Sequence, residues 1–110
     1  MAGTVRALPL GYAPISKQTL TVSSSAVGFT VPTSQTTAVR SALVTVEYVT
    51  ATTDTVRYWI TGDNPTTTEG HLLYNGDILE LSNVMAVTNF RVIATGNDMK
   101  LQIEYFGGGY

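Results

Sequence analysis

His71 is the one histidine in the chain, and it is the first residue to test for chemistry. A catalytic histidine needs a nucleophile and an orienting acid beside it. The sequence contains no G-x-S-x-G elbow, no H-E-x-x-H motif and no paired carboxylates. The Asn75-Gly76 turn instead places His71 opposite Glu80, as an ordinary cross-strand pair. We therefore expect no enzyme activity, and turnover abolished by His71→Ala is the result that would favour an enzyme.

Metal-binding residue types are equally sparse. The chain has no cysteine, which excludes disulfides, thiol nucleophiles and thiolate metal sites. Asp63, Asn64 and Glu69 share one loop, but their spacing matches no EF-hand, so an ordinary turn is favoured over calcium. The glycine run 107–109 precedes only Tyr110 and no helix, so it is not a phosphate loop. We expect no metal and no cofactor.

Aromatic residues offer a third kind of site. Trp59, with Tyr48, Tyr58 and Tyr74, could form a platform on which a sugar stacks. Tyr48 and Tyr58 fall in the apolar phase of their strands, which predicts that both are core residues. Trp59 and Arg57 share the opposite face, and these residue types are enriched at interfaces. We expect a partner chain to bury Arg57 and Trp59, with a carbohydrate-binding module using Trp59 as the alternative.

The composition limits the partners. The 110 residues are 44% hydrophobic and 13% charged, with a net charge of −2, so no basic patch is expected to bind nucleic acid. No run approaches the roughly 20 apolar residues of a membrane helix. Only two lysines are available to protect sheet edges. Such a surface predicts that another chain covers part of it.

The elements that would position these residues are short strands with period-2 alternation. The longest is Val39–Thr50, in which Ala42, Val44, Val46 and Tyr48 face one way. A short helical turn is expected over Asn83–Thr88. The other expected strands lie in the ranges Leu20–Ser23, Ala26–Val31, Thr55–Thr61, Leu72–Tyr74, Asp77–Leu79, Phe90–Ala94 and Met99–Ile103.

Two turn sequences predict hairpins. Asn75-Gly76 is typical of a two-residue type I′ turn, which needs a positive φ at both residues. Gly96-Asn97 gives a second hairpin with a consistent register on both faces. In that register Ala94, Val92 and Phe90 lie opposite Met99, Leu101 and Ile103.

Together these signals predict an all-β domain, an antiparallel β-sandwich of jelly-roll-like type with seven to nine short strands. A small β-barrel is the alternative. The expected organisation is an extended N-terminal arm over residues 1–16, a sandwich domain over residues 17–106 and a C-terminal tail over residues 107–110.

The arm is apolar but has neither helix nor strand period, and proline interrupts it. It could lie across its own domain as a first strand, or pack on a neighbouring subunit. The interface alternative makes Leu8, Leu10, Tyr12 and Ile15 its anchors, with Tyr110 of the tail as a further contact.

The C-terminal half resembles small virion structural proteins of tailed bacteriophages. The pattern is an arginine-bearing strand, a D-x-x-P-T loop, L-x-x-G-D, and then F-R-x-I-A before a last strand ending in aromatics; the loop of this chain is one residue shorter, D-x-P-T. The matching residues are Arg57, Asp63, Pro65, Thr66, Gly70, Leu73, Gly76, Asp77, Phe90, Arg91, Ile93, Ala94, Tyr105 and Phe106.

The resemblance implies a head decoration, or cement, protein that binds the outer capsid surface and stabilises it. Such proteins are commonly homotrimers seated on the major capsid protein, after synthesis in the host cytoplasm. A tail or tail-tip component is the alternative within the same class. The resemblance assigns no binding residue, because its motif positions are turn and core residues.

Overall fold

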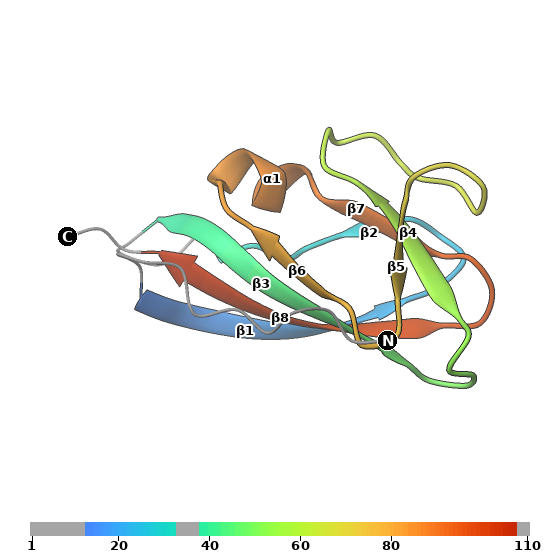
Figure 1. The fold of residues 1–110 in the computed structure, drawn as a ribbon. Helices are drawn as coiled ribbons and strands as arrows, with labels where there is room; N and C mark the ends of the chain where they lie inside the picture. The colour runs from blue at the N-terminus through green and yellow to red at the C-terminus, as the bar shows by residue number, and fades with distance from the viewer. Residues whose placement is uncertain (1–12, 33–37, 108–110) are drawn as a thin grey trace.

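The computed structural model describes residues 13–32 and 38–107, which form eight strands and one short helix (Figure 1). Sheet I has the strand order β1-β8-β3-β6, and sheet II has the order β2-β7-β4-β5. The bounds are β1 (Ala13–Val22), β2 (Val27–Gly28), β3 (Val39–Tyr48), β4 (Thr55–Trp59), β5 (His71–Tyr74), β6 (Ile78–Leu81), α1 (Val84–Asn89), β7 (Arg91–Ala94) and β8 (Met99–Gly107).

The pairing follows a simple rule. Each strand pairs antiparallel with its counterpart counted from the other end: β1 with β8, β2 with β7, β3 with β6 and β4 with β5. These four pairs describe one long hairpin, in which the chain reverses direction at the β4–β5 loop. Rolling the hairpin adds the β3–β8 and β4–β7 pairs and completes two sheets. This is the eight-stranded jelly roll, so the sandwich prediction is confirmed and the closed-barrel alternative is wrong.

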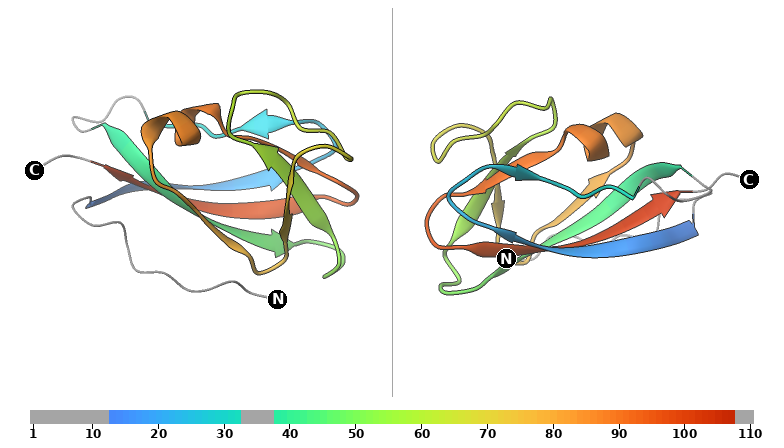
Figure 2. Two further views of the ribbon diagram at one scale, coloured as in Figure 1. Left: turned by 45° about the horizontal axis from the view of Figure 1, so that its top comes forward. Right: turned by 180° about the vertical axis from the view of Figure 1, so that it is seen from behind.

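Figure 2 shows the two layers from further sides, with β1, β8 and β3 side by side in the long layer. The inward residues of both sheets form one core, in which Phe90 stacks on Phe29 at 4.4 Å and on Tyr58 at 5.4 Å between ring centroids. The expected helical turn is present as α1, which buries Ala86 and Val87. Its N-cap, Asn83, accepts a hydrogen bond from the Ala86 N–H.

Both predicted hairpins are wrong in the same way. The turns exist, but each carries the chain from one sheet to the other. β5 pairs with β4 and β6 with β3, while β7 pairs with β4 and β8 with β3. The residues expected to pair across the Gly96-Asn97 loop are all buried, yet they belong to facing sheets rather than to neighbouring strands.

The Asn75-Gly76 turn has a different geometry from the predicted type I′. Gly76 has a φ of 90°, whereas no non-glycine residue in the described ranges has a positive φ. A positive φ at the second central position alone is the pattern of a type II turn. The Gly76 N–H donates to the Val46 carbonyl at 2.8 Å and Asn75 Oδ1 accepts from the Tyr48 N–H at 3.2 Å. These bonds fix the crossing point of the chain against β3.

The expected domain boundaries shift by a few residues. β1 begins at Ala13, so Ala13, Pro14 and Ser16, which the sequence assigned to the arm, pair with β8. Ile15 lies at an irregularity between Pro14 and Ser16, and it packs against the core of its own chain. Gly107, expected in the tail, is the last residue of β8 and pairs with Ala13.

Candidate functional site

His71 does not meet Glu80. In β5 it pairs with Tyr58, while Glu80 in β6 pairs with Leu43 of the other sheet. The predicted cross-strand pair is therefore wrong, because it depended on the β5–β6 hairpin. The imidazole lies 5.1 Å from the Trp59 ring centroid, edge to face, and 5.2 Å from that of Tyr58. His71 is thus part of an aromatic cluster at the end of β4.

Arg57 has a structural task within its own chain. Its Nη1 donates to the Gly70 carbonyl at 2.7 Å and its Nε donates to the Thr67 carbonyl at 3.2 Å. Hydrogen bonds from a charged donor are stronger than neutral ones. The guanidinium therefore holds the β4–β5 loop against the outward side of sheet II. This use competes with the predicted role of Arg57 at a subunit interface.

The same loop is tied to a second arginine. Arg91 donates from Nε to Asn64 Oδ1 at 2.9 Å and from Nη2 to the Ala26 carbonyl at 3.1 Å. Pro65 is buried, and Ile93, which faces outward from β7 beside Arg57, is only 8% exposed. The loop thus forms a third layer over sheet II. Among the described residues no three His, Cys, Asp or Glu side chains gather closely enough to hold a metal ion.

The aromatic residues divide differently from the prediction. Tyr58 is half-buried against Phe90, and burial raises its pKa above the usual value. Tyr48, expected in the core, is 45% exposed, because β3 ends there and the chain turns away. Trp59 is half-buried, and its ring meets the His71 imidazole edge to face.

An exposed apolar surface lies around the β5–β6 turn. We define the turn surface as Tyr48, Val49, Leu72 and Tyr74, which are 45%, 50%, 38% and 51% exposed. The Asn75 side chain joins these residues, because it follows Tyr74 and bonds the Tyr48 backbone. The sequence pattern does not predict this surface. The feature that could have revealed it is that all four residues lie at strand ends or on an edge strand, where alternation no longer implies burial.

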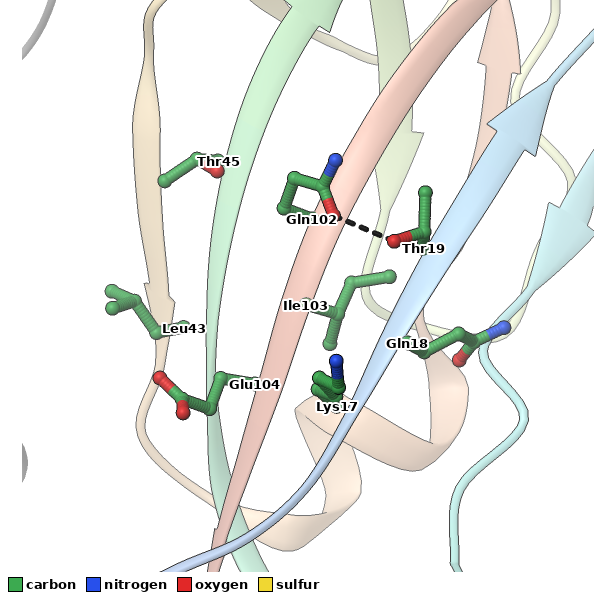
Figure 3. Close-up of a pocket in the computed structure, with 8 residues that line it drawn as sticks. All are labelled: Lys17, Gln18, Thr19, Leu43, Thr45, Gln102, Ile103 and Glu104. Atoms are coloured by element: carbon green, nitrogen blue, oxygen red, sulfur yellow. Dashed lines mark hydrogen bonds between the residues drawn. The ribbon is translucent and has the colours of Figure 1, made fainter.

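A shallow hollow of about 320 Å³ lies on the outward face of sheet I (Figure 3). Three neighbouring strands line it, and six of the eight lining residues form two cross-strand rows, while Gln18 and Ile103 pair between these rows. Thr19 Oγ1 donates to Gln102 Oε1 at 2.7 Å, and Gln102 Nε2 donates to Glu47 Oε1 at 3.0 Å. The lining residues are Lys17, Gln18, Thr19, Leu43, Thr45, Gln102, Ile103 and Glu104.

The predicted site residues that lie in the described ranges, which are Ile15, Arg57 and Trp59, do not line the hollow. The other predicted site residues, Leu8, Leu10, Tyr12 and Tyr110, lie outside the described ranges. Sequence alternation alone marks the outward phase of each strand, but it cannot show that Thr19, Gln102 and Thr45 form one row. That row depends on β8 lying between β1 and β3, which is a property of the rolled topology.

No protein-family model, curated protein or solved structure matches this chain. No helix in the described ranges has the length and apolar character needed to span a membrane. The surfaces of the domain itself and the sequence resemblance are therefore the basis for assigning a function.

Proposed function

We propose that this chain is a non-enzymatic virion structural protein of a tailed bacteriophage, a decoration or cement protein of the outer head surface. It would act as a homotrimer and bind the major capsid protein. The resemblance in the C-terminal half supports this assignment. The fold is compatible with it, because jelly rolls are common among viral capsid domains, although the same fold also serves lectins and cupins.

The turn surface carries the proposal. Two tyrosines, a leucine and a valine lie exposed around one turn of a domain whose charged residues are few. Aromatic residues gathered on an exposed apolar surface mark protein contacts. The β5–β6 connection keeps the surface rigid, since Gly76 and Asn75 are both bonded to β3. A decoration protein that stabilises a capsid needs a rigid apolar surface of this kind to bind it.

The surface also replaces part of the predicted interface. Arg57 is engaged with Thr67 and Gly70, and Ile15 packs on its own core. We therefore assign the contact to Leu72, Tyr74 and their neighbours on the turn surface, with Trp59 at the far end of β4 as a secondary contact. The carbohydrate-binding alternative has less support, because no aromatic residue among those the structure describes lines the hollow on sheet I.

A paired substitution tests the proposal. Leu72→Ser with Tyr74→Ser removes apolar area from two exposed positions, so the fold should tolerate it. Val84→Ser with Met85→Ser on α1 is the matched control, because both residues are exposed and β6 separates them from the turn. Sedimentation velocity would report the trimer. Cosedimentation with shells assembled from the capsid gene of the same genome would report head binding.

We expect the wild-type chain and the α1 control to form trimers and to bind shells, and the Leu72/Tyr74 variant to lose both properties. A wild-type chain that stays monomeric and leaves shells bare would contradict the proposal. Binding to purified tails rather than to shells would favour the tail alternative. Specific glycan binding lost in Trp59→Ala would favour the carbohydrate-binding module.

A further inference from the structure

The Asn75-Gly76 turn contains a pair of residues that can react with each other. The amide carbon of an asparagine can be attacked by the backbone nitrogen of the next residue. Glycine favours this attack, because it has no side chain to shield its nitrogen or to restrict its backbone. Asn75 is the only asparagine in the chain that precedes a glycine. The others, Asn64, Asn83, Asn89 and Asn97, precede proline, valine, phenylalanine and aspartate.

The reaction is a deamidation, and its only co-reactant is water. The Gly76 nitrogen bonds to Asn75 Cγ, the Cγ–Nδ2 bond breaks, and the proton of the nitrogen leaves with the amide group as ammonia. The succinimide ring that forms takes up one water molecule at either of its two carbonyl groups. Ring opening at one carbonyl gives aspartate. Opening at the other gives isoaspartate, in which the main chain runs through the former side-chain methylene.

The fold holds both reacting groups against β3 (Figure 1). The Gly76 N–H donates to the Val46 carbonyl at 2.8 Å, and Asn75 Oδ1 accepts from the Tyr48 N–H at 3.2 Å. Ring closure requires the Gly76 nitrogen to give up its proton and the Asn75 side chain to rotate toward it. Both hydrogen bonds to β3 must therefore open before the pair can react.

Asp77 strengthens the same turn. Its N–H donates to the Tyr74 carbonyl at 2.9 Å, and its own carbonyl accepts from the Val46 N–H at 3.1 Å. Its carboxylate Oδ2 accepts from the Tyr74 N–H at 2.7 Å. Only this last bond depends on the side chain, so a substitution at Asp77 can loosen the turn while the Asn75-Gly76 pair stays intact.

We propose that Asn75 is a deamidation site controlled by the β5–β6 turn: it reacts when the turn opens from β3, and the isoaspartate product then keeps the turn open. The extra methylene in the main chain lengthens the turn. It also moves the free carboxylate away from the place where Asn75 Oδ1 accepts the Tyr48 N–H. The aspartate product keeps the main chain and the acceptor. The inference is independent of the proposed function.

Peptide mass spectrometry with isoaspartate detection would follow the conversion of Asn75 at mildly alkaline pH, in the folded chain and in the chain unfolded in urea. We expect conversion in the folded chain to be at least about tenfold slower, because it requires local opening of the turn. Equal rates in the two states would overturn the proposal.

Asp77→Ala tests the role of the turn, since it removes the bond to the Tyr74 N–H. We expect this variant to convert about two- to tenfold faster than wild type when folded, as the loss of one hydrogen bond allows, and at the same rate when unfolded. Asp98→Ala is the matched control, because it removes the same charge at an exposed position of the other turn between the sheets. It should convert like wild type. No acceleration in Asp77→Ala, or equal acceleration in both variants, would overturn the proposal.

If Asp77→Ala does not fold, the wild-type chain alone decides. Hydrogen exchange at the Gly76 N–H and deamidation at Asn75 both require the bond to Val46 to open. Both rates should therefore rise in parallel as urea is added below the unfolding transition. A conversion rate that does not follow the exchange rate would overturn the proposal.

The product provides a second measurement. The isoaspartate chain, separated by chromatography, should exchange the Tyr48 and Gly76 N–H groups at least about tenfold faster than the Asn75→Asp chain does. The buried residue Leu101 should exchange alike in both chains, which shows that the core is intact. Unchanged exchange at Tyr48 and Gly76 would overturn the claim that isoaspartate keeps the turn open.

Discussion

The Tyr105 hydroxyl donates a hydrogen bond of 2.6 Å to Gln18 Oε1, and this bond joins β8 to β1 inside the sandwich. The same oxygen accepts the Thr30 N–H at 3.0 Å, so the Gln18 side chain also ties the segment after β2 to sheet I. Tyr105 is fully buried and meets Phe29 edge to face at 6.2 Å. The pair is therefore a polar tie within sheet I that also holds the segment after β2.

Tyr105→Phe should remove one bond of this tie and keep the ring. We expect the free energy of unfolding to fall by about 0.5–1.5 kcal/mol, since Gln18 keeps Thr30 as a partner. Gln18→Leu should cost more, because it leaves both the buried Tyr105 hydroxyl and the Thr30 N–H unpaired. Urea unfolding would measure both variants. Thr30→Ala keeps the backbone N–H that Gln18 accepts, so its free energy of unfolding should stay close to that of wild type. A large loss of stability in this variant would show that the Thr30 side chain, and not its backbone N–H, is the group that matters.

Alkaline pH should weaken the fold through the same tyrosine. Burial raises the pKa of Tyr105 from 10.0 to about 12, and burial also raises the pKa of Tyr58. A raised folded-state pKa favours the neutral form, so its contribution is complete below the unfolded-state pKa of 10.0 and is lost as the pH rises toward about 12. Urea midpoints across this range should fall less steeply in Tyr105→Phe than in wild type. An identical slope would contradict the assignment.

Arg57→Lys should loosen the third layer over sheet II. A lysine keeps the charge but cannot reproduce two guanidinium bonds to the Thr67 and Gly70 carbonyls. We expect a loss of about 1–3 kcal/mol, with faster hydrogen exchange confined to the β4–β5 loop and to Ile93 beneath it. Arg40→Lys, at an exposed position in β3, is the matched control and should change neither quantity. Uniformly faster exchange throughout the domain would show that Arg57 acts on the whole fold.

The sequence predicted the fold class, the turns and most of the core, but not which strands are neighbours. Period-2 alternation identifies an inward face, and it does so correctly for Val92, Ala94, Met99 and Leu101, which are all buried. It does not say to which sheet that face belongs. Two buried strands joined by a tight turn look alike in sequence whether they pair side by side or face each other across the core.

The site was harder to predict for a related reason. Arg57 and Trp59 have the outward phase, which suggested an open surface, yet a loop brought back by the chain fills it. Tyr48 has the inward phase but lies at the last residue of β3, beyond the reach of the opposite sheet. Exposure at strand ends and under loops depends on tertiary packing, and alternation carries no information about it.

The end of sheet I offers a last prediction, which concerns two glycines without positive φ. At Gly107 a Cβ would overlap the backbone carbonyl of Ala38 and would approach Ile15 Cδ1 to 2.6 Å. The isoleucine side chain can rotate, but the carbonyl belongs to the chain that leads into β3 and cannot yield. At Gly96 the nearest atom is Asp54 Oδ1 at 3.7 Å, an ordinary contact.

Gly107→Ala should therefore destabilise the domain by about 1–3 kcal/mol or more, as overpacking against fixed backbone does. Gly96→Ala should lie within about 0.5 kcal/mol of wild type, since its surface loop has room for a methyl group. Urea unfolding of the two variants compares the same chemical change at two sites and cancels the effect of glycine on the unfolded chain. Equal midpoints would mean that β8 does not run to Gly107 against Ala38 in solution.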